Sequence, residues 1–250
     1  MINLSIIILT WNNLDATRQC LASLEPIMAR GDVETIVVDN ASQDGTPEAI
    51  RREFPSARLM CNSVNRGVAA ARNQGFIRAR GSKLLILDND TIVSREAIEG
   101  MEHYLDSHND VGLCACRMTD AEGRLQPSFR PYPGLISKLC SLFHIKRPLS
   151  TFRTDSEGCI EPLYVIGACQ MIKREAVAQV GMLDEAIFYG PEDADYCMRL
   201  RKAGWRIKYL PHFSIIHAYQ RTTAHRPFSM LGWKHVQGLF HLYGKYGRWN

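Results

Sequence analysis

The 250-residue sequence lacks the marks of several protein classes. It has no low-complexity tract and no internal repeat, which excludes a disordered linker and a repeat array. No apolar run approaches the roughly 20 residues that a membrane-spanning helix needs. The apolar start, Met1–Leu9, has neither the basic leader nor the cleavage site of a signal peptide. We therefore expect a globular protein that stays in the cytoplasm.

Paired cysteine spacing is also absent. The eight cysteines are scattered, and only Cys114 and Cys116 lie close together, which is a weak indication of zinc binding. Most of them are expected to be small buried side chains in a reducing compartment.

Acidic residues are missing from Tyr196 onward, where ten lysines and arginines lie. Because the whole chain has a formal charge of +4, the residues before this segment carry −6. This asymmetry predicts an anionic partner, which could be a diphosphate, an acidic lipid surface or nucleic acid.

Short apolar runs alternate with helical patterns through the first half of the chain. This alternation is typical of an α/β protein with a Rossmann-like, mostly parallel sheet flanked by helices. The predicted strands are Leu4–Thr10, Glu34–Val38, Arg58–Asn62, Leu84–Leu87, Leu163–Ile166, Arg206–Leu210 and Ser214–Ile216. The predicted helices are Leu14–Ala29, Thr46–Phe54, a small-residue helix after Gly67, Ser94–Ser107, Arg174–Val180 and Tyr196–Ala203. Prolines interrupt the pattern between 120 and 160, where we expect an irregular excursion with one short helix near Leu135–Phe143.

Polar side chains follow four of the predicted strands. They are Thr10-Trp11-Asn12, Asp39-Asn40, Asp88-Asn89-Asp90 and His217. Ligands of an open parallel sheet bind beyond the carboxyl ends of its strands, so we expect these groups to share one crevice. Asp88 and Asp90 lie on the same side of a strand end, and their oxygens suit Mg²⁺ or Mn²⁺. The triplet is equally good turn chemistry, and both interpretations stand at this point.

Six segments occur in the order found in family 2 glycosyltransferases. They are Ile6–Asn12, Val37–Ser42, Asn65–Gly75, Asp88–Asp90, Gly167–Ala168 and Glu192–Leu200. The chain resembles this family over nearly its whole length, and within it the rhamnosyltransferase-like branch that builds bacterial surface polysaccharides. The resemblance implies the GT-A fold and an inverting, metal-dependent transfer from a nucleoside diphosphate sugar to a glycan or lipid-linked acceptor. The donor would be dTDP- or UDP-linked, with rhamnose as the first guess.

The resemblance also implies roles for single residues. Asp39 would accept a hydrogen bond from N3–H of uracil or thymine, and Arg72 would pair with a donor phosphate. Asp90 and His217 would bind Mg²⁺ or Mn²⁺, while Asp88 would contact the ribose or the donor sugar. The donor-binding set implied is Thr10, Trp11, Asn12, Asp39, Asn65, Gly67, Arg72, Asn73, Asp88 and Asn89. Outside the family, Asn12 and Asn73 could simply cap turns, and a lone histidine after a strand is usually structural.

Asp193 matches the catalytic base of the family. A single displacement needs one carboxylate near the acceptor hydroxyl, and the metal stabilises the departing diphosphate. Glu192 and Asp195 have the same chemistry, so the choice of Asp193 rests on the resemblance. Glu192 and Trp205 are assigned to the acceptor, with core packing as the competing interpretation of Trp205.

We predict a single domain, 1–250, with a nucleotide-sugar-binding half (1–115) and an acceptor-binding half (116–250). Its segment 225–250 interleaves aromatic and basic residues, which suits either peripheral contact with an anionic membrane at its inner face or a helix packed on the domain. No nucleic acid partner is expected. Two alternatives remain: a haloacid-dehalogenase-like phosphatase, whose motif would need Thr or Val where Ile92 stands, and a non-catalytic sugar-nucleotide-binding protein.

Overall fold

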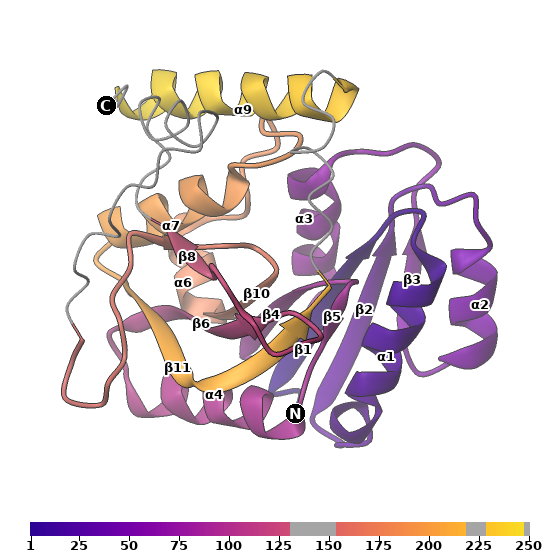
Figure 1. The fold of residues 1–250 in the computed structure, drawn as a ribbon, viewed down its shortest axis with the longest axis horizontal. Coiled ribbons are helices and arrows are strands. Elements are labelled where there is room, and N and C mark those ends of the chain that lie inside the picture. Colours follow the sequence, from indigo (N-terminus) through magenta and orange to yellow (C-terminus); the bar gives the residue numbers. More distant parts are fainter. Residues whose placement is uncertain (131–153, 219–228, 248–250) are drawn as a thin grey trace.

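The computed structural model describes residues 1–130, 154–218 and 229–247, which form an α/β fold around one large curled sheet (Figure 1). The described strands of this sheet lie in the order β3-β2-β1-β4-β10-β6-β11-β5, with β7 paired to β6, while β8 and β9 form a separate two-stranded sheet. The strands are β1 (Leu4–Thr10), β2 (Val33–Asp39), β3 (Arg58–Cys61), β4 (Lys83–Asp88), β5 (Thr91–Ile92), β6 (Val111–Thr119), β7 (Leu125–Gln126), β8 (Phe129–Arg130), β9 (Tyr164–Val165), β10 (Cys169–Lys173) and β11 (Arg206–His217). The helices are α1 (Leu14–Met28), α2 (Thr46–Glu53), α3 (Val68–Arg78), α4 (Arg95–Ser107), α6 (Arg174–Val180), α7 (Glu192–Lys202) and α9 (Met230–Tyr246).

The strands β3, β2, β1 and β4 run parallel, which confirms the prediction for the first half of the chain. Strands β1, β2 and β4 are almost continuously buried, because helices cover both faces of this part of the sheet. In their register, Thr10 stands beside Asp39 and Leu9 beside Asp88. The carboxyl ends of three strands therefore meet at one edge, as the strand-end motifs predicted.

The second half of the sheet differs from the prediction. Strand β10 is antiparallel and lies between β4 and β6, and neither β10 nor β6 was predicted from the sequence. Strand β10 is continuously buried and β6 is buried from Val111 to Cys116, so neither shows the regular alternation of polar and apolar residues that marks a half-exposed strand. The strands expected at Arg206–Leu210 and Ser214–Ile216 form one strand, β11, whose register with β6 shifts between Leu210 and Ser214.

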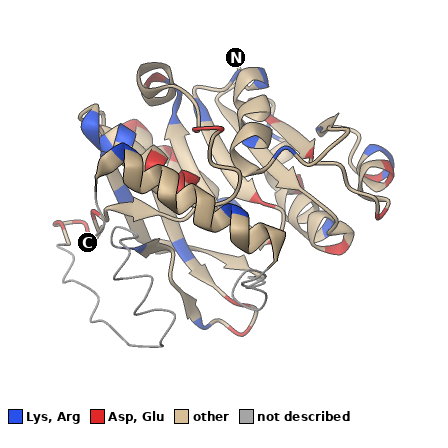
Figure 2. Ribbon diagram, turned by 90° about the horizontal axis from the view of Figure 1, so that it is seen from above, with Lys and Arg blue, Asp and Glu red and all other residues tan. Residues whose placement is uncertain are grey.

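Most of the described lysines and arginines after Asp195 pair with acidic residues from earlier in the chain. The ion pairs, with nitrogen to oxygen distances, are Arg199–Asp195 (2.8 Å), Arg201–Glu161 (3.6 Å), Arg206–Asp110 (2.9 Å), Lys208–Asp155 (2.7 Å) and Lys245–Asp184 (2.9 Å). Basic and acidic residues are accordingly interspersed along the described ribbon (Figure 2). The charge asymmetry of the sequence does not become a separate basic face in the described part of the structure.

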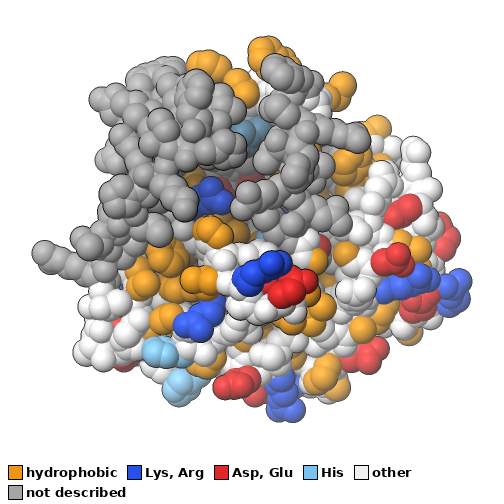
Figure 3. Space-filling view, viewed as in Figure 1, with side chains coloured by type: hydrophobic (Ala, Val, Ile, Leu, Met, Phe, Trp, Pro, Cys, Tyr) orange, Lys and Arg blue, Asp and Glu red, His pale blue; other side chains and the backbone are white. Residues whose placement is uncertain are grey.

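Helix α9 lies across the end of the molecule next to α7 (Figure 1). Its inner side buries Leu242 and Tyr243, and a Cβ added at Gly238 would lie only 2.7 Å from the Gly190 carbonyl oxygen. On its outer side Met230, Trp233 and Phe240 are exposed, and Figure 3 shows hydrophobic side chains along this top edge. The segment therefore contains a helix packed on the domain.

The remaining predictions for irregular segments lie partly outside the described residues. These include the short helix near Leu135–Phe143 and the side chains Arg221, Arg226, Phe228, Arg248 and Trp249. Among the helices that the structure describes, none combines the length and apolarity needed to cross a bilayer.

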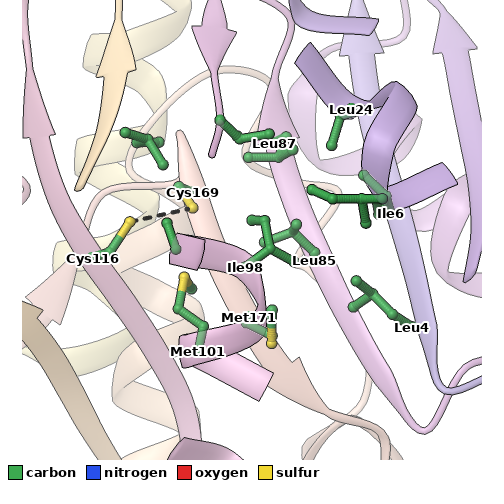
Figure 4. Packing of buried hydrophobic residues seen from close by; sticks show 14 of the residues in the cluster. Leu4, Ile6, Leu24, Leu85, Leu87, Ile98, Met101, Cys116, Cys169 and Met171 are labelled. Carbon is green, nitrogen blue, oxygen red and sulfur yellow. Dashed lines mark hydrogen bonds between the residues drawn. The ribbon is translucent and has the colours of Figure 1, made fainter. Parts of the chain in front are cut away.

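The core fills both faces of the sheet. One cluster joins β1 and β4 to α1 and α4, with Ile6, Leu85 and Ile98 among its fully buried side chains (Figure 4). In the same cluster the thiols of Cys116 and Cys169 are 4.0 Å apart, in contact and without a disulfide bond. Within the described residues only Cys61 among the cysteines is exposed, which confirms the prediction that most of them are buried.

Candidate active site

Three groups that could hold a metal ion come together at the carboxyl edge of the sheet. Asp88 ends β4, Asp90 follows in the turn to β5, and His217 ends β11. Their potential ligand atoms all lie within 4.8 Å of one another. The pairing of β5 with β11 causes this approach, because it sets His217 opposite Thr91.

Gln126 of β7 orients the His217 imidazole. Its side-chain oxygen lies 3.0 Å from Nδ1, and its amide nitrogen donates to the His217 carbonyl at 2.9 Å. This arrangement favours the hydrogen on Nδ1, so that Nε2 faces Asp90 Oδ1 at 3.4 Å. Burial lowers the pKa of His217, but the bond to Asp90 and the charges of Asp90 and Asp88 outweigh burial and raise it. Gln126 was not predicted as a site residue, since it lies in the segment where the pattern of the sequence weakens.

The same triplet also makes a well-bonded turn. Thr91 Oγ1 donates to the Asp88 carbonyl at 2.8 Å, and the Asn89 amide donates to Thr10 and Thr17 at 3.2 and 2.9 Å. These bonds use Asn89 to fix the turn and leave the two carboxylates beside His217. Two carboxylates and an imidazole are a donor set that fits a divalent cation such as Mn²⁺ or Mg²⁺.

Asp39 is buried at the end of β2 with one side-chain oxygen unused. Its Oδ2 accepts from the Ser42 amide at 3.0 Å, while Oδ1 has no hydrogen-bond partner within the described structure. A buried carboxylate oxygen without a donor is costly, which is the condition expected where a ligand N–H completes the bond.

The turn after β1 is hydrogen-bonded to the turn that follows Asp39. Asn12 has a φ of +47°, which asparagine tolerates better than most residues, and its side-chain oxygen accepts from the Gln43 amide at 2.7 Å. The backbone N–H of Asn12 donates to Ser42 Oγ at 2.9 Å. Thr10 is buried, whereas Trp11 is half exposed and available to a ligand.

The loop before α3 is built around Asn40 and Asn65. The Asn40 amide donates to Asn65 Oδ1 at 2.9 Å, and the Gly67 amide donates to the same oxygen at 2.9 Å. Gly67 has a φ of +82°, and a Cβ there would lie 2.6 Å from the Phe188 carbonyl oxygen, so this position requires glycine. Asn65 and Gly67 thus shape the rim of the predicted donor site.

Arg72 and Asn73, both assigned to the donor, are buried among protein groups. Arg72 contacts Asp88 and Glu192, at 2.5 and 3.3 Å. The Asn73 amide donates to the Leu183 carbonyl, and its oxygen accepts from the Leu183 amide, both at 2.9 Å. Asn73 therefore ties α3 to the 183–185 loop, which agrees with the competing structural interpretation and gives no support to donor contact.

The three acidic residues at the start of α7 have different environments. Asp195 is fully buried and bonded to Arg199, Lys245 and Tyr246, at 2.8, 2.7 and 2.9 Å. Glu192 is buried against Arg72, and burial together with the charge of Asp193 raises its pKa to about 7. Asp193 is partly exposed and accepts from the Gly167 amide at 3.2 Å.

The structure does not bring Trp205 to this site. It precedes β11 at the end opposite His217, where its ring packs on Gly112 and its indole N–H donates to Gln179 at 2.7 Å. The buried Glu192 likewise faces Arg72 instead of an open surface. Core packing, the competing interpretation, explains Trp205.

The carboxyl ends of the strands in an open α/β sheet are where such folds bind their ligands, and here they carry carboxylates and an imidazole that could hold a metal ion. Residues 5–181 match the family model "Glycosyl transferase family 2", and the chain belongs to that family. It is a glycosyltransferase, which overturns the phosphatase alternative.

The curated relatives include rhamnosyltransferases. The chain is 28% identical to the N-acetylglucosaminyl-diphospho-decaprenol L-rhamnosyltransferase of Mycobacterium tuberculosis, over 98% of this chain and 86% of the relative. It is 22% identical to the dTDP-rhamnosyl transferase RfbF of Shigella flexneri, over 73% of this chain and 59% of that protein. These relatives confirm the predicted similarity to rhamnosyltransferases.

Solved structures share the GT-A fold. The mannosyltransferase PcManGT of Pyrobaculum calidifontis, in complex with GDP-Man and Mn²⁺, has a TM-score of 0.63 at 21% identity, covering 88% of this chain and 57% of that one. The TarS 1–349 structure of S. aureus in complex with UDP-GlcNAc has a TM-score of 0.61 at 17% identity, covering 88% of this chain and 59% of that one. The chain thus spans somewhat more than half of these structures.

Proposed function

We propose that this glycosyltransferase inverts the anomeric centre and requires a divalent metal, and that it moves a sugar from a nucleoside diphosphate donor to a glycan or lipid-linked acceptor. The observation that carries the proposal is the cluster of Asp88, Asp90 and His217 at the sheet edge where the buried Asp39 has one side-chain oxygen without a hydrogen-bond partner among the described residues. Residues 1–115 would bind mainly the donor, and residues 116–250 the acceptor.

The donor would lie along the carboxyl ends of β1, β2 and β4. The unused Oδ1 of Asp39 would accept from N3–H of uracil or thymine, a contact that a purine would fit poorly. Trp11 and the 65–67 loop would border the nucleoside. Rhamnose on a thymidine diphosphate is the first candidate, because the relative RfbF is a dTDP-rhamnosyl transferase.

Asp90 and His217 would hold Mg²⁺ or Mn²⁺, with Asp88 beside them. The metal, when bound, supplies positive charge that stabilises the departing diphosphate. Gln126 keeps the imidazole in the orientation and tautomer that direct Nε2 to the cluster.

Asp193 would act as the base that removes the proton of the acceptor hydroxyl. Its partial exposure supports this choice over Glu192 and Asp195, whose carboxylates are buried in protein contacts. The Gly167 amide fixes one oxygen of Asp193 at 3.2 Å. Inversion follows from a single displacement, so an α-linked donor would give a β product and a β-linked donor an α product.

A lipid-linked acceptor would bring the protein to the inner face of a membrane from the cytoplasm, and the mycobacterial relative is named for such an acceptor. The exposed Met230, Trp233 and Phe240 of α9 are the apolar residues that we propose to contact an anionic bilayer. Sedimentation with anionic vesicles should show weak, salt-sensitive binding that Trp233→Ser reduces and the equally exposed control Ile77→Ser does not. Absence of binding at low salt would remove membrane contact from the proposal.

A thermal-shift panel of nucleoside diphosphate sugars tests the donor assignment. A ligand that binds only the folded state raises the unfolding temperature, so the true donor should do so in the presence of Mn²⁺ or Mg²⁺. A protein that binds the donor but releases no nucleoside diphosphate with any acceptor would be the non-catalytic alternative. If purine-linked sugars alone stabilise the protein, the role of Asp39 is wrong.

A further inference from the structure

Arg72 is one buried cation shared between the metal cluster and the start of α7. Its side chain is 4% exposed. One terminal nitrogen, Nη2, donates to Asp88 Oδ1 at 2.5 Å and to the Gly167 carbonyl at 3.0 Å, and the other, Nη1, donates to Glu192 Oε1 at 3.3 Å. A single guanidinium thus joins β4, the 167 turn and α7.

Gly167 extends this chain of contacts to Asp193. Its carbonyl accepts from Arg72, while its amide donates to Asp193 Oδ2. A Cβ at position 167 would lie 2.6 Å from Arg72 Nη1, so the close approach of the guanidinium requires glycine here. The proposed base and Asp88 are therefore linked by three consecutive polar contacts.

Asp88 and Glu192 share the positive charge of Arg72 through different terminal nitrogens. Asp88 also belongs to the metal cluster, whereas Glu192 is buried, and its second oxygen, Oε2, has no hydrogen-bond partner within the described structure. A divalent cation and the guanidinium would draw on the same Asp88 carboxylate. Arg72 should then oppose metal binding, and Glu192 should favour it by attracting Arg72 away from Asp88.

We propose that Arg72 is a positioning residue that couples metal occupancy at Asp88, Asp90 and His217 to the placement of Asp193. This inference rests on the proposed function for the identity of the metal site and the base. It gives Arg72 a role between the metal cluster and the proposed base, where the sequence had suggested contact with a donor phosphate.

The affinity for Mn²⁺ alone, measured by calorimetric titration at pH 8 without donor, tests the coupling. Arg72→Gln should bind Mn²⁺ about tenfold more tightly, and Glu192→Gln about tenfold more weakly, because the two changes shift the competition for Asp88 in opposite directions. Arg72→Lys should lie between Arg72→Gln and the wild type. In transfer assays Arg72→Gln should lower kcat more than it changes the KM for the donor.

A second ion pair on α7 provides the matched control. Arg199 and the fully buried Asp195 also pair at 2.8 Å, and neither contacts Asp88. Arg199→Gln and Asp195→Asn should leave the Mn²⁺ affinity within about twofold of the wild type. Thermal unfolding shows which variants fold. If Arg72→Gln does not fold, the Mn²⁺ affinities of Glu192→Gln and Arg72→Lys still test the coupling.

Unchanged Mn²⁺ affinity in the Arg72 and Glu192 variants, changes of the same sign in both glutamine variants, or equal changes in the Arg199 control would each overturn the coupling. Failure of the proposed function has a different signature, since the wild-type protein would then release no nucleoside diphosphate with any metal, whatever the affinities of the variants.

Discussion

The two ends of the candidate site are built in different ways. At the end that we propose binds the nucleoside, here called the nucleoside end, the turns after the adjacent strands β1 and β2 bond to each other, with Asn12 accepting from Gln43 and donating to Ser42. At the metal and base end, β4, β7, β11 and α7 contribute residues that meet only because of the strand pairing. The nucleoside end is thus a local structure, whereas the metal and base end depends on the complete fold.

At the metal and base end, the largest effect on transfer is expected from replacing the proposed base, Asp193. Asp193→Asn keeps the size of the side chain and removes its basicity, so transfer should fall by about 10²- to 10⁴-fold. Donor binding, measured by thermal shift with Mn²⁺, should remain as in the wild type, because Asp193 is assigned to the acceptor hydroxyl and not to the donor. A variant with near wild-type transfer would show that another group is the base.

Glu192, at the same end, should make the free energy of unfolding of the protein depend on pH. Burial and the charge of Asp193 raise its pKa to about 7 from an ordinary value of 4.5. Between these two pH values the Glu192 carboxyl is protonated in the folded protein and ionised in the unfolded chain. The ionised form therefore destabilises the fold, and the cost appears as the pH rises from about 4.5 to 7.

Glu192→Gln removes that cost because glutamine does not ionise. Its free energy of unfolding relative to the wild type should rise across this window, by at most about 3 kcal/mol. Urea unfolding at pH 4.5, 6 and 8 measures the difference. A difference that stays constant with pH would contradict the assigned environment of Glu192.

A smaller and more selective effect is expected at the nucleoside end. Asp39→Asn replaces one of the two carboxylate oxygens, Oδ1 or Oδ2, by an amide nitrogen and removes the negative charge. Donor affinity should fall by about 1.5 kcal/mol, or roughly tenfold. Mn²⁺ affinity without donor should not change, because Asp39 is not part of the metal cluster. Equal losses in donor and Mn²⁺ affinity would show that the two ends are not separable.

The difference between the two ends also explains what could be predicted from sequence. Thr10, Asp39 and Asp88 end apolar strands of the parallel sheet, so their common edge followed from periodicity and the known rule for such sheets. The strand-end pattern placed His217 in the same crevice, but its metal-binding role and the role of Asp193 were assigned only through the family resemblance. The pairing of β5 with β11 that brings His217 to Asp90, and the 167 turn that links Asp193 to Arg72, join segments far apart in sequence, and no local pattern predicts them.

Several residues could not be placed from sequence for identifiable physical reasons. Gln126 lies in a short strand within an irregular segment, and Gln170 is a polar residue inside the buried strand β10, where its amide donates to the Val165 carbonyl at 2.9 Å. The charge of Arg72 suggested a phosphate, yet its two carboxylate partners come from segments 16 and 120 residues away in sequence. Such pairings appear only in three dimensions.

The requirement for a divalent metal tests the central claim most directly. Release of nucleoside diphosphate from the donor that the thermal-shift panel identifies should cease when the wild-type protein is treated with a chelator, and should return on addition of Mn²⁺ or Mg²⁺. His217→Gln should lower that release and require more metal to restore it. Transfer that continues unchanged in the chelator would contradict the assignment of Asp88, Asp90 and His217 as the metal site.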